Sequence, residues 1–568
     1  SPCISLILLS PPAMKDYFFP VLLCWCMPFM APVLQAQNDS TLILSPDILQ
    51  EKDIRVRNND LAPSLFYSAT RSEEQSDNLP FSTWSISAEE ILRNGFVTLG
   101  DVLKAAPGIR VSQPGNAQEG EMFLIRGMSG NQYVKILIND VPVKPSVMGG
   151  TPIGAQFPVR QAQRIEVLYG PATALYGHEA CAGVVNIILK ESDRPLFTQA
   201  DLSFGNNGFN SLDLMFGGKL GRNKKAFRFS LYGSSTVRNW YSSDQTSDTI
   251  ALFSMNTYTP SVWATPYYKS SFNYRPRDQG EGFTLRSAMP HESRMLGLDL
   301  RWRGFQFTYH RLVRSDQSAL GLNPLSLSAE NPADYVRERT DIFALQRRYA
   351  NQRRESYHAL SFTRYNMDRY SSASYILDRV MKASFRFRQD SLPTQDLFTT
   401  FKEVELEYGF FAGYHAAACL DVRVESKTTF RLGKYWQWTG GMISQFSRGM
   451  PFTSYMREPA NIRLFNPPLF PFRTALDLVY VTGLEGDIYT QLAYKRRRFS
   501  ASFSGMIASG SGDVTSGVWT ALNPRVALLW KADSSFSVWA NYGTGMRYGT
   551  AFYLRNTYLV GEGGYLRR

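Results

Sequence analysis

Cysteine and histidine are scarce in this sequence, which limits the chemistry that it supports. Its 568 residues include five cysteines and five histidines. Three of the cysteines lie close to the N-terminus, which leaves Cys181 and Cys419 for the rest of the chain. Two cysteines are too few for a disulfide framework, and two buried free thiols are favoured over a Cys181–Cys419 bridge. The histidines, at positions 178, 291, 310, 358 and 415, are dispersed.

Motifs of the common enzyme classes are missing as well. His178-Glu179 and His291-Glu292 are not followed by the second histidine of a zinc-protease helix. The sequence has no Gly-x-Ser-x-Gly elbow and, outside the N-terminal segment, no Cys-x-x-Cys pair. The stretch 170–177 resembles a phosphate-binding loop but lacks its Gly-Lys-Ser/Thr ending. We therefore expect no catalytic residues, no bound metal and no cofactor.

Long apolar runs are absent from the interior of the chain. None approaches the roughly 18 residues that a membrane helix requires, and the mean hydropathy is slightly negative (−0.24). Aromatic residues nevertheless make up 14% of the chain, with 30 Tyr and 37 Phe. An aromatic-rich chain of this kind can cross a membrane as a β-barrel, because its apolar residues alternate with polar ones.

The formal net charge of +12 raises the question of nucleic-acid binding. The densest basic run, Lys495–Arg498, lies between two segments of alternating polarity and is interpreted as a solvated hairpin turn. A charged lumen or contacts with lipid phosphates account for the remaining balance. We therefore expect no nucleic-acid partner.

The N-terminus has the layout of a secretory signal peptide. Met14-Lys15 opens a short basic region, residues 17–34 are mostly apolar, and Leu34-Gln-Ala36 ends in a small residue suited to cleavage. Residues 1–13 precede the expected start. Cys24 raises the alternative of a lipoprotein, which the bulky Leu23 before it disfavours. Residues 1–36 are therefore interpreted as an overrun of the gene model ahead of the start at Met14, followed by the signal peptide.

Residues 37–78 are polar and lack sustained periodicity, so a flexible arm is expected there, followed by a small α/β domain over 79–191. Ser87 and Glu90 form a capping box for a helix that should stop at Gly95, and Thr98 can cap a second helix. The second helix should bury Leu99, Val102 and Leu103 and end at Pro107-Gly108. Short strands are expected at 109–111, 122–125, 134–138, 164–169 and 184–189.

Beyond Lys190 the polarity alternates with a period of two residues. The clearest hairpin joins Leu296–Trp302 to Phe305–Tyr309 through Arg303-Gly304. Long polar inserts are expected at about 237–292, 313–352 and 449–483, between hairpins with short turns. This pattern is typical of transmembrane β-strands with aromatic residues near the lipid headgroups. It favours a partial barrel over 192–568 above the alternative of a soluble sandwich or propeller.

A series of motifs in the α/β domain resembles the plug domain of TonB-dependent outer-membrane receptors. In order, these are Thr98-Leu-Gly-Asp-Val-Leu, Ala106-Pro-Gly-Ile, Ile125-Arg-Gly, Val134-Lys-Ile-Leu-Ile-Asn-Asp, Arg164-Ile-Glu-Val-Leu-Tyr-Gly-Pro, Leu175-Tyr-Gly and Gly183-Val-Val-Asn-Ile-Ile. The resemblance implies a mainly β fold, in which an N-terminal α/β plug lies inside an antiparallel transmembrane β-barrel. It also implies a Gram-negative outer-membrane location.

The segment Ser64–Thr70 resembles the TonB box, a short extended stretch that the periplasmic domain of TonB captures by strand addition. The resemblance assigns this coupling role to Leu65, Phe66, Tyr67, Ser68 and Ala69. Tyr67-Ser68 departs from the commoner pair of β-branched residues, which leaves the exact boundaries open.

Charges in the plug motifs are expected to contact the inner barrel wall, because buried charges require partners. The resemblance implies such contacts, or a role in the stability of the plug, for the motif residues Arg126, Gly127, Arg164, Glu166, Gly170 and Pro171. Gly127, Gly170 and Gly177 are expected at turns that need a positive φ.

The resemblance implies active transport of a scarce ligand, with TonB, outer-membrane lipids and a small-molecule chelate as partners. A ferric siderophore or similar chelate is expected, because residues 37–78 are too short for the extra domain of glycan receptors. Cobalamin, glycan and haem uptake remain alternatives, as does a non-transporting receptor or adhesin. The haem receptors' Phe-Arg-Ala-Pro is replaced here by Met546-Arg-Tyr-Gly549. The ligand-binding residues are not fixed by the motifs; Trp240, Tyr241, Tyr267 and Tyr268 are candidates.

The number of strands that can be placed after Lys190 is about fourteen, whereas plugged transporters close with about 22. The chain ends at Tyr565-Leu-Arg-Arg without the terminal aromatic strand of the family. A C-terminally truncated sequence is therefore expected.

Overall fold

A computed structural model describes the chain in separate segments between Thr41 and Leu566. The described residues are 41–42, 65–68, 74–75, 79–191, 194–221, 226–240, 272–274, 290–318, 334–376, 404–406, 410–456, 459, 480–512, 515–533, 536–547, 558–560 and 564–566. The expected signal peptide, most of the arm, Ala69, Tyr241, Tyr267 and Tyr268 lie outside these residues.

The plug contains two small sheets and four short helices. Its five-stranded sheet has the order β4 (Thr83–Ser87), β10 (Ala162–Tyr169), β11 (Gly183–Leu189), β8 (Val134–Ile138) and β9 (Val141–Pro142). Its three-stranded sheet comprises β5 (Ile109–Asn116), β6 (Gly120–Ile125) and β7 (Met128–Ser129). The helices are α1 (Ala88–Arg93), α2 (Leu99–Ala105), α3 (Gly130–Tyr133) and α4 (Thr173–Tyr176).

The capping box expected at Ser87 and the helix cap expected at Thr98 are both present. The Ser87 hydroxyl accepts a hydrogen bond from the Glu90 amide (3.3 Å), while the Ser87 amide donates to the Glu90 carboxylate (2.8 Å). Thr98 and Asp101 repeat this arrangement at α2. The α2 residues Leu99, Val102 and Leu103 are fully buried, so the apolar face that these residues define anchors the helix in the plug core.

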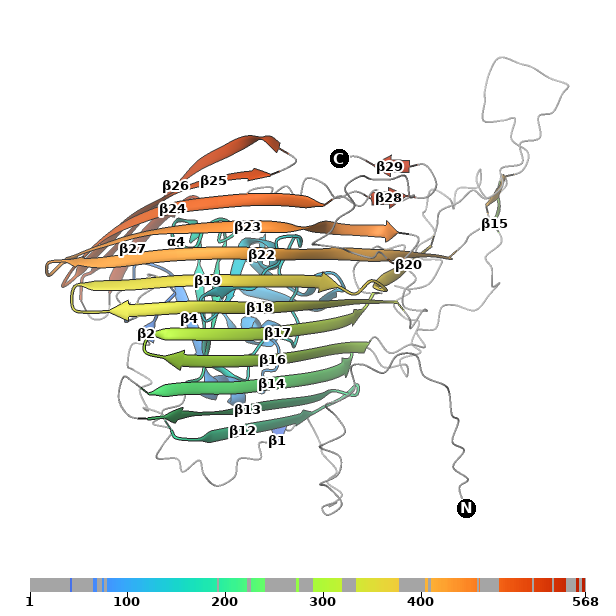
Figure 1. Ribbon diagram of the computed structural model, residues 1–568, viewed down its shortest axis with the longest axis horizontal. Coiled ribbons are helices and arrows are strands. Elements are labelled where there is room, and N and C mark those ends of the chain that lie inside the picture. Colours follow the sequence, from blue (N-terminus) through green and yellow to red (C-terminus); the bar gives the residue numbers. More distant parts are fainter. Residues whose placement is uncertain are drawn as a thin grey trace, which may run out of the picture. The chain divides into compact units, whose positions relative to one another are not determined.

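Most of the other described strands form a large antiparallel sheet, which we call the wall (Figure 1). Its 15 strands run in sequence order from β1 (Thr41–Leu42) to β27, with β20 (Ser372–Ile376) paired to β22 alongside. The remaining strands are β12 (Phe197–Phe204), β13 (Asn210–Leu220), β14 (Phe227–Asn239), β16 (Pro290–Trp302), β17 (Phe305–Gln317), β18 (Tyr335–Ala350), β19 (Arg354–Met367), β22 (Phe410–Leu432), β23 (Trp436–Met456), β24 (Val481–Arg496), β25 (Phe499–Gly512), β26 (Thr515–Lys531) and β27 (Ser537–Gly543).

Three two-stranded pairs complete the described elements. They are β2 (Leu65–Phe66) with β3 (Glu74–Gln75), β15 (Phe272–Tyr274) with β21 (Val404–Leu406), and β28 (Tyr558–Val560) with β29 (Gly564–Leu566). In the described part of the chain the strand order of the wall is open, with β1 and β27 at its two ends. No helix within the described segments is long and apolar enough to cross a membrane.

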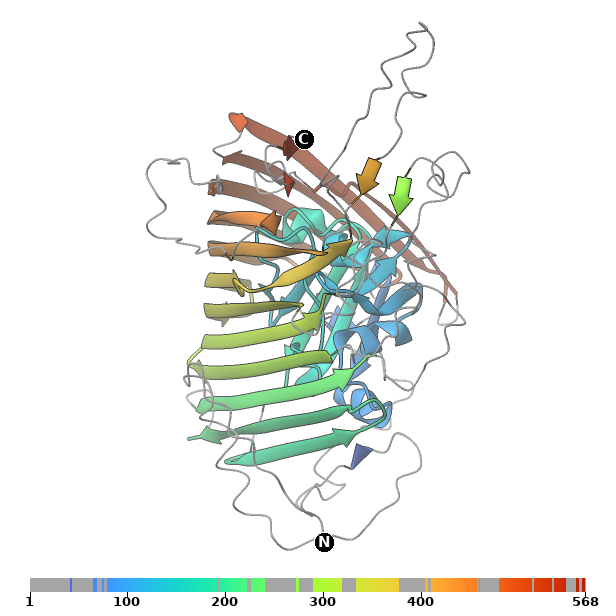
Figure 2. The same cartoon turned by 90° about the vertical axis from the view of Figure 1, so that its right-hand side faces the viewer.

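The wall curves around one side of the plug (Figure 2), and the expected two-residue alternation separates its faces. Met295, for example, is 4% exposed and packs in the same apolar cluster as plug strand residues, whereas the adjacent Leu296 is 44% exposed. Leu296 and Trp302 share the outward face, as the sequence pattern predicts. The mainly β architecture with an α/β plug is thereby confirmed.

One expected insert is wrong in its extent. Residues 313–352 contain the end of β17 and all of β18, so only the segment between 318 and 334 separates the two strands. The outward positions of β18 carry Arg337 and Arg339 before they carry Phe343 and Leu345. The apolar alternation therefore fades along β18, although the backbone pairing continues.

The two strand connections at Arg303-Gly304 and Gly433 differ in how much room they leave for a side chain. Gly304 has φ +83°, and a Cβ there would lie 2.6 Å from the carbonyl oxygen of Arg348. Gly433 has φ +76°, but nothing lies within 4 Å of its Cβ position. An L-residue pays about 1–2 kcal/mol for a left-handed conformation at either place.

We therefore expect Gly304→Ala to lower the free energy of unfolding more than Gly433→Ala. The second substitution should cost about 1 kcal/mol from backbone strain alone, and the first should add the displacement of the Arg348 carbonyl, which accounts for about 1 kcal/mol more. Thermal unfolding of both variants in the same detergent tests this order, and equal losses would contradict it.

Candidate coupling segment and plug–wall interface

The carboxylate of Glu166 holds the candidate coupling segment against the plug. Glu166 lies on β10 and is fully buried. It accepts hydrogen bonds from the Tyr67 amide (3.1 Å), the Ser68 amide (2.8 Å) and the Ser68 hydroxyl (2.7 Å). Arg164, two residues earlier on the same strand, donates from Nε to Glu166 at 2.7 Å. The buried Glu166 carboxylate is thus surrounded by hydrogen-bond donors, three of which come from the coupling segment.

Further contacts fix the same segment. The Tyr176 hydroxyl donates to the Ser68 carbonyl (2.8 Å), and the Asn186 amide donates to the Ser68 hydroxyl (3.3 Å). Phe66 is 1% exposed and belongs to an apolar cluster with Leu79 and Leu168. The segment is therefore held by apolar packing on one residue and by hydrogen bonds on the next two.

A chain of polar contacts links this segment to the wall. Asn186, the cross-strand partner of Glu166, donates to Asp140 at 2.9 Å. Asp140 in turn accepts from the guanidinium of Arg348 on β18 (2.5 Å). Arg348 also lies over the Tyr67 ring, 5.2 Å from its centre. The coupling segment, two plug strands and the wall thus share one connected network.

The backbone of the segment is already engaged in this state. Capture by strand addition uses backbone N–H and C=O groups, and the amides of Tyr67 and Ser68 donate to Glu166. Leu65 and Phe66 pair with Glu74 and Gln75 in the β2–β3 ladder. A partner strand would have to displace these contacts before it could pair with the same groups.

The plug-motif residues occupy different surroundings. Arg126 is exposed, with φ +50°, and its guanidinium lies 5.6 Å from the centre of the Tyr169 ring. Arg164 and Glu166 pair with each other inside the plug. Pro171 does reach the wall, because a Cβ on Gly543 of β27 would lie 3.1 Å from its Cγ.

Pro171 thus lies next to the wall, whereas the described contacts of Arg126, Arg164 and Glu166 lie within the plug or the coupling segment. Gly127, Gly170 and Gly177 have φ of +82°, +90° and +80°, as expected for turn glycines.

Other residues make the polar contacts between plug and wall. Arg314 on β17 is completely buried and forms ion pairs with Asp316 and Glu338 of the wall. Its guanidinium also donates to the carbonyls of Ala117 and Gln118 in the plug, each at 3.0 Å. Three further plug–wall hydrogen bonds join Ser146 to Asp421 (2.6 Å), Gln161 to Asp213 (3.0 Å) and Gln346 to the Asn139 carbonyl (2.9 Å).

The sequence analysis assigned no role to the residues that link the plug to the wall. Two of the plug residues, however, had positions from which a buried polar contact could have been predicted. Asn186 and Asp140 are polar residues inside or at the end of otherwise apolar strands within the quoted motifs. A polar side chain in such a position requires a partner. The wall partners Arg314 and Arg348 carried no comparable signal, because charged residues are frequent along the strands.

His178 joins the plug to two acids of the wall. Its Nε2 lies 3.2 Å from Glu485 and its Nδ1 lies 3.9 Å from Asp487, both on β24. Burial lowers the pKa of His178, but the two carboxylates outweigh burial, so the pKa is raised above the ordinary 6.5. The neighbouring Lys135, whose pKa burial lowers to about 8, opposes this rise.

Glu179 follows His178 with φ +75° and pairs with Lys144. Burial raises the pKa of Glu179, but Lys144, His178 and Lys135 outweigh it and hold the pKa at about 2. The anion is thus retained in a buried position by the surrounding cations. Within the described segments, no three His, Cys, Asp or Glu side chains converge as a metal ion requires. Cys181 and Cys419 are unpaired; Cys419 is buried and Cys181 is half-buried.

Aromatic and basic side chains meet near the ends of β14 and β16 that lead into the long connections. Arg238 lies 4.1 Å from the centre of the Trp240 ring and 3.8 Å from Glu121 of the plug. Burial is the main cause that raises the pKa of Glu121. Arg547 donates to Gln132 (3.2 Å) and to the Gly149 carbonyl. These residues place cations above the plug loops at this end of the wall.

Comparison with known proteins gives the class of this fold. Residues 75–184 match the TonB-dependent Receptor Plug Domain family. The structure resembles BauA, the ferric preacinetobactin receptor from Acinetobacter baumannii, with a TM-score of 0.57 and 14% identity; the match covers 84% of this chain and 65% of BauA. It likewise resembles the pyoverdine receptor FpvA from Pseudomonas aeruginosa PAO1, with a TM-score of 0.57, 12% identity and coverage of 84% and 64%.

A third similar structure is the ferric-catecholate import receptor Fiu from E. coli K12. Its TM-score is 0.57 at 13% identity, and the match covers 89% of this chain and 70% of Fiu. At this identity the likeness concerns the fold, and the chain spans under two thirds of BauA and FpvA. Residues 75–184 thus match the plug-domain family, and the described part of the chain shares the fold of these three receptors.

Glu166→Gln should release the coupling segment. The substitution keeps the size of the side chain but removes the charge that binds three donors of the segment, which should weaken docking by about 3 kcal/mol. A spin label on Leu65→Cys should become more mobile in Glu166→Gln than in the parent. Glu89→Gln is the matched control, because that carboxylate is exposed on α1 and pairs only with Arg93 in the described structure. Identical spectra for Glu166→Gln and Glu89→Gln would contradict docking by Glu166.

His178→Gln should remove a pH-dependent part of the stability. Because the pKa of His178 is raised in the folded protein, its stabilising contribution is complete below pH 6.5 and is lost as the pH rises through the folded pKa. Thermal unfolding midpoints measured from acidic to alkaline pH should fall more steeply for the parent than for His178→Gln. Parallel pH profiles would show that the contact with Glu485 and Asp487 adds no stability.

Proposed function

We propose that this protein is an active transporter that takes up a ferric siderophore or similar metal chelate and couples to TonB through residues 64–70. In this proposal residues 37–78 form the arm, 79–191 the plug and 192–568 the strand region. The observation that carries the proposal is a plug held against the wall, with its candidate coupling segment docked on Glu166. The names of the similar structures support the ligand class, since BauA, FpvA and Fiu are receptors for ferric or pyoverdine-type ligands.

Transport would proceed without covalent chemistry on the ligand. The ligand would bind above the plug loops, where Arg238, Trp240 and Arg547 supply cationic and aromatic groups suited to an anionic, aromatic chelate. TonB would then capture the coupling segment, and its pull would act on the plug. Plug–wall hydrogen bonds such as Ser146–Asp421 can be exchanged for bonds to water at a small net cost, because each contributes only about 1 kcal/mol.

The contacts of the docked segment provide a path along which a pull by TonB would act on the plug. Displacing Ser68 from Glu166 would leave a buried carboxylate with fewer donors, and the adjoining Asn186–Asp140–Arg348 contacts reach the wall. Removing partners from a buried charge is costly, so a pull on Ser68 would be transmitted to the sheet of the plug. Glu166, Arg164 and the coupling residues Leu65–Ala69 are therefore proposed as the energy-coupling site.

Uptake is tested in a host from which the gene has been deleted, grown under iron limitation with a panel of ferric chelates. Growth on one chelate should be restored by the intact gene and not by a version lacking residues 64–70, which should still bind the chelate. Equal growth of the deletion strain and its parent on every chelate would refute the siderophore assignment and favour cobalamin or glycans. Restoration by the version without residues 64–70 would refute coupling through this segment and favour a non-transporting receptor.

Ser68→Pro and Ser68→Ala separate backbone pairing from side-chain effects. Proline has no N–H, so Ser68→Pro should block strand addition and lower chelate uptake roughly tenfold or more. Ser68→Ala retains the backbone donor and should keep most of the uptake. Chelate binding to whole cells provides the control, since neither substitution touches the opposite end of the wall. Normal uptake by Ser68→Pro would show that TonB engages another stretch.

A further inference from the structure

Exposed cations gather where neighbouring wall strands are joined by short turns. Four of these turns connect β16 to β17, β18 to β19, β22 to β23 and β24 to β25. Ten of their exposed basic residues, which we call the cationic rim, are Arg303, Arg347, Arg353, Arg354, Arg431, Lys434, Lys495, Arg496, Arg497 and Arg498. Arg348 is also exposed but pairs with Asp140 of the plug, so it is not counted in the rim. Across the turn segments 301–305, 347–355, 431–438 and 494–499, Glu355 is the single acidic residue.

Aromatic rings, not carboxylates, hold several of these cations. Arg303 lies 4.7 Å from the centre of the Trp302 ring, and Arg347 lies 4.9 Å from that of Phe305. Lys434 and Arg496 both lie 5.5 Å from the centre of the Tyr435 ring. Stacking on a ring positions a guanidinium without neutralising it, so its N–H donors remain available to an anion.

Elsewhere on the wall, several exposed arginines are paired with acids. Arg311 and Arg339 both pair with Asp341, at 2.7 and 3.2 Å, and Arg294 pairs with Glu292. In the described structure no ion pair is formed by Arg303, Arg347, Arg354 or Arg496. The positive charge is therefore concentrated at the turn end, which indicates an anionic partner there.

Exposed aromatic side chains form a collar next to the rim. Trp302 and Phe305 flank one turn, Trp436 follows a second and Phe499 follows a third, each being 40–50% exposed on the wall. Tryptophan and tyrosine gather where a membrane-spanning strand passes the lipid headgroups. A cationic rim beside such a collar lies at the depth of lipid phosphates.

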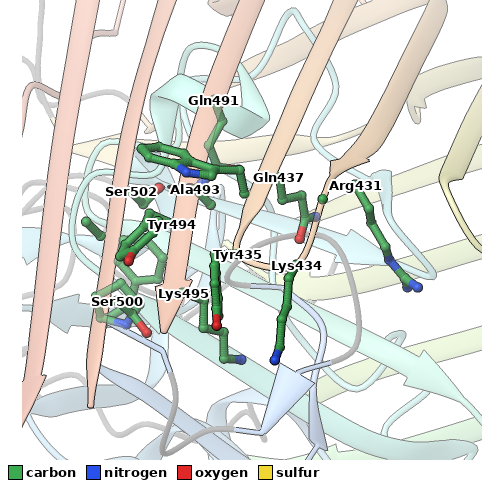
Figure 3. A pocket seen from close by; sticks show the side chains of 15 residues that line it. Arg431, Lys434, Tyr435, Gln437, Gln491, Ala493, Tyr494, Lys495, Ser500 and Ser502 are labelled. Atoms are coloured by element: carbon green, nitrogen blue, oxygen red, sulfur yellow. Dashed lines mark hydrogen bonds between the residues drawn. The ribbon is translucent and has the colours of Figure 1, made fainter. Parts of the chain in front are cut away.

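A cavity of about 180 Å³ opens within the rim (Figure 3). Arg431, Lys434 and Lys495 line it together with the Tyr435 and Tyr494 rings, and no acidic residue contributes to its lining. Figure 3 shows Lys434, Tyr435 and Lys495 from two neighbouring turns grouped at one side of this cavity. Pro80 and Phe81 of the plug also line it.

We propose that the cationic rim binds the phosphate groups of anionic phospholipids in the leaflet that faces the periplasm. The orientation rests on the proposed function: Tyr67 of the coupling segment contacts Arg348 beside the same turns, and TonB acts from the periplasm. A lipid surface suits the rim better than a free phosphate ion, because the cations are spread over four hairpins beside an aromatic collar. Each basic side chain near an anionic membrane surface adds to the attraction.

Lipid retention tests the proposal on the protein expressed from its intact gene and purified in a neutral detergent. The protein is offered phosphatidylglycerol or phosphatidylcholine of equal chain length, and bound lipid is counted by native mass spectrometry. We expect phosphatidylglycerol to be retained roughly tenfold over phosphatidylcholine, as several added cations imply. The triple variant Arg303→Gln, Arg354→Gln, Arg496→Gln should lose this preference, and Arg496→Gln alone should lose part of it.

The matched control neutralises three exposed cations away from the rim: Arg294→Gln, Arg337→Gln and Arg369→Gln. Arg337 and Arg369 also stack on tyrosines, at 4.8 and 4.5 Å, so two of the three control residues share the type of contact found at the rim, while Arg294 pairs with Glu292. This control should retain phosphatidylglycerol as the parent does. Equal losses in both triple variants, or no preference in the parent, would overturn the proposal.

Excess inorganic phosphate separates a lipid surface from a site for the free ion. Phosphatidylglycerol should stay bound in its presence, and complete displacement would overturn the assignment to lipid. Chelate uptake measured on the same variants distinguishes the two proposals. A parent that prefers phosphatidylglycerol but takes up no chelate would refute the proposed transport while the lipid site stands.

Discussion

Hydrogen bonds and ion pairs form a large part of the interface between plug and wall. The position of the plug against the wall depends on these polar contacts. Arg314 donates to two plug carbonyls, and Asp421 accepts from Ser146. Apolar packing alone would exclude water and resist any displacement of the plug. Polar contacts hold a defined position, yet their groups can return to water without a large net loss, because water offers equivalent partners. Such an interface is stable at rest and remains separable under force.

The hydrogen bonds around Glu166 are another example of polar contacts that hold a segment in a defined position. A buried carboxylate is costly unless donors surround it, and Ser68 supplies two of the donors that Glu166 uses. The coupling segment therefore supplies hydrogen-bond donors to a buried carboxylate of the plug. Its departure would also break the hydrogen bond from Asn186 to Ser68, and Asn186 is linked through Asp140 to Arg348. The connection between a terminal segment and the wall follows from the need to satisfy one buried charge.

Charge is distributed differently along the strands of the wall. Arginines such as Arg314 and Arg339 have acidic partners, whereas several at the short turns, such as Arg303 and Arg347, stack on aromatic rings. The net charge of +12 thus has a structural source in the turns, of which Lys495–Arg498 was the one recognised in the sequence. An ion pair satisfies a cation locally, and a ring leaves it able to meet an anion.

The sequence by itself determined the local elements. The helix caps at Ser87 and Thr98, the turn at Arg303-Gly304 and the alternation through Leu296–Trp302 depend on neighbours a few residues away, so their signals are contained in short stretches. The plug motifs also predicted the domain that the family match covers. Where the local signal weakens, as in β18 with Arg337 and Arg339 on its outward face, the extent of the strand was wrong.

Only the tertiary structure decided which charges meet. Glu166 and Ser68 are 98 residues apart, and Arg348 and Asp140 are 208 apart. Arg164 and Glu166 carried a signal of buried charge but none that named the coupling segment as their partner. Pairing over such separations depends on the register of the sheets and on how the plug lies against the wall. A periodic pattern specifies which face a side chain occupies, and only the assembled fold specifies what it faces.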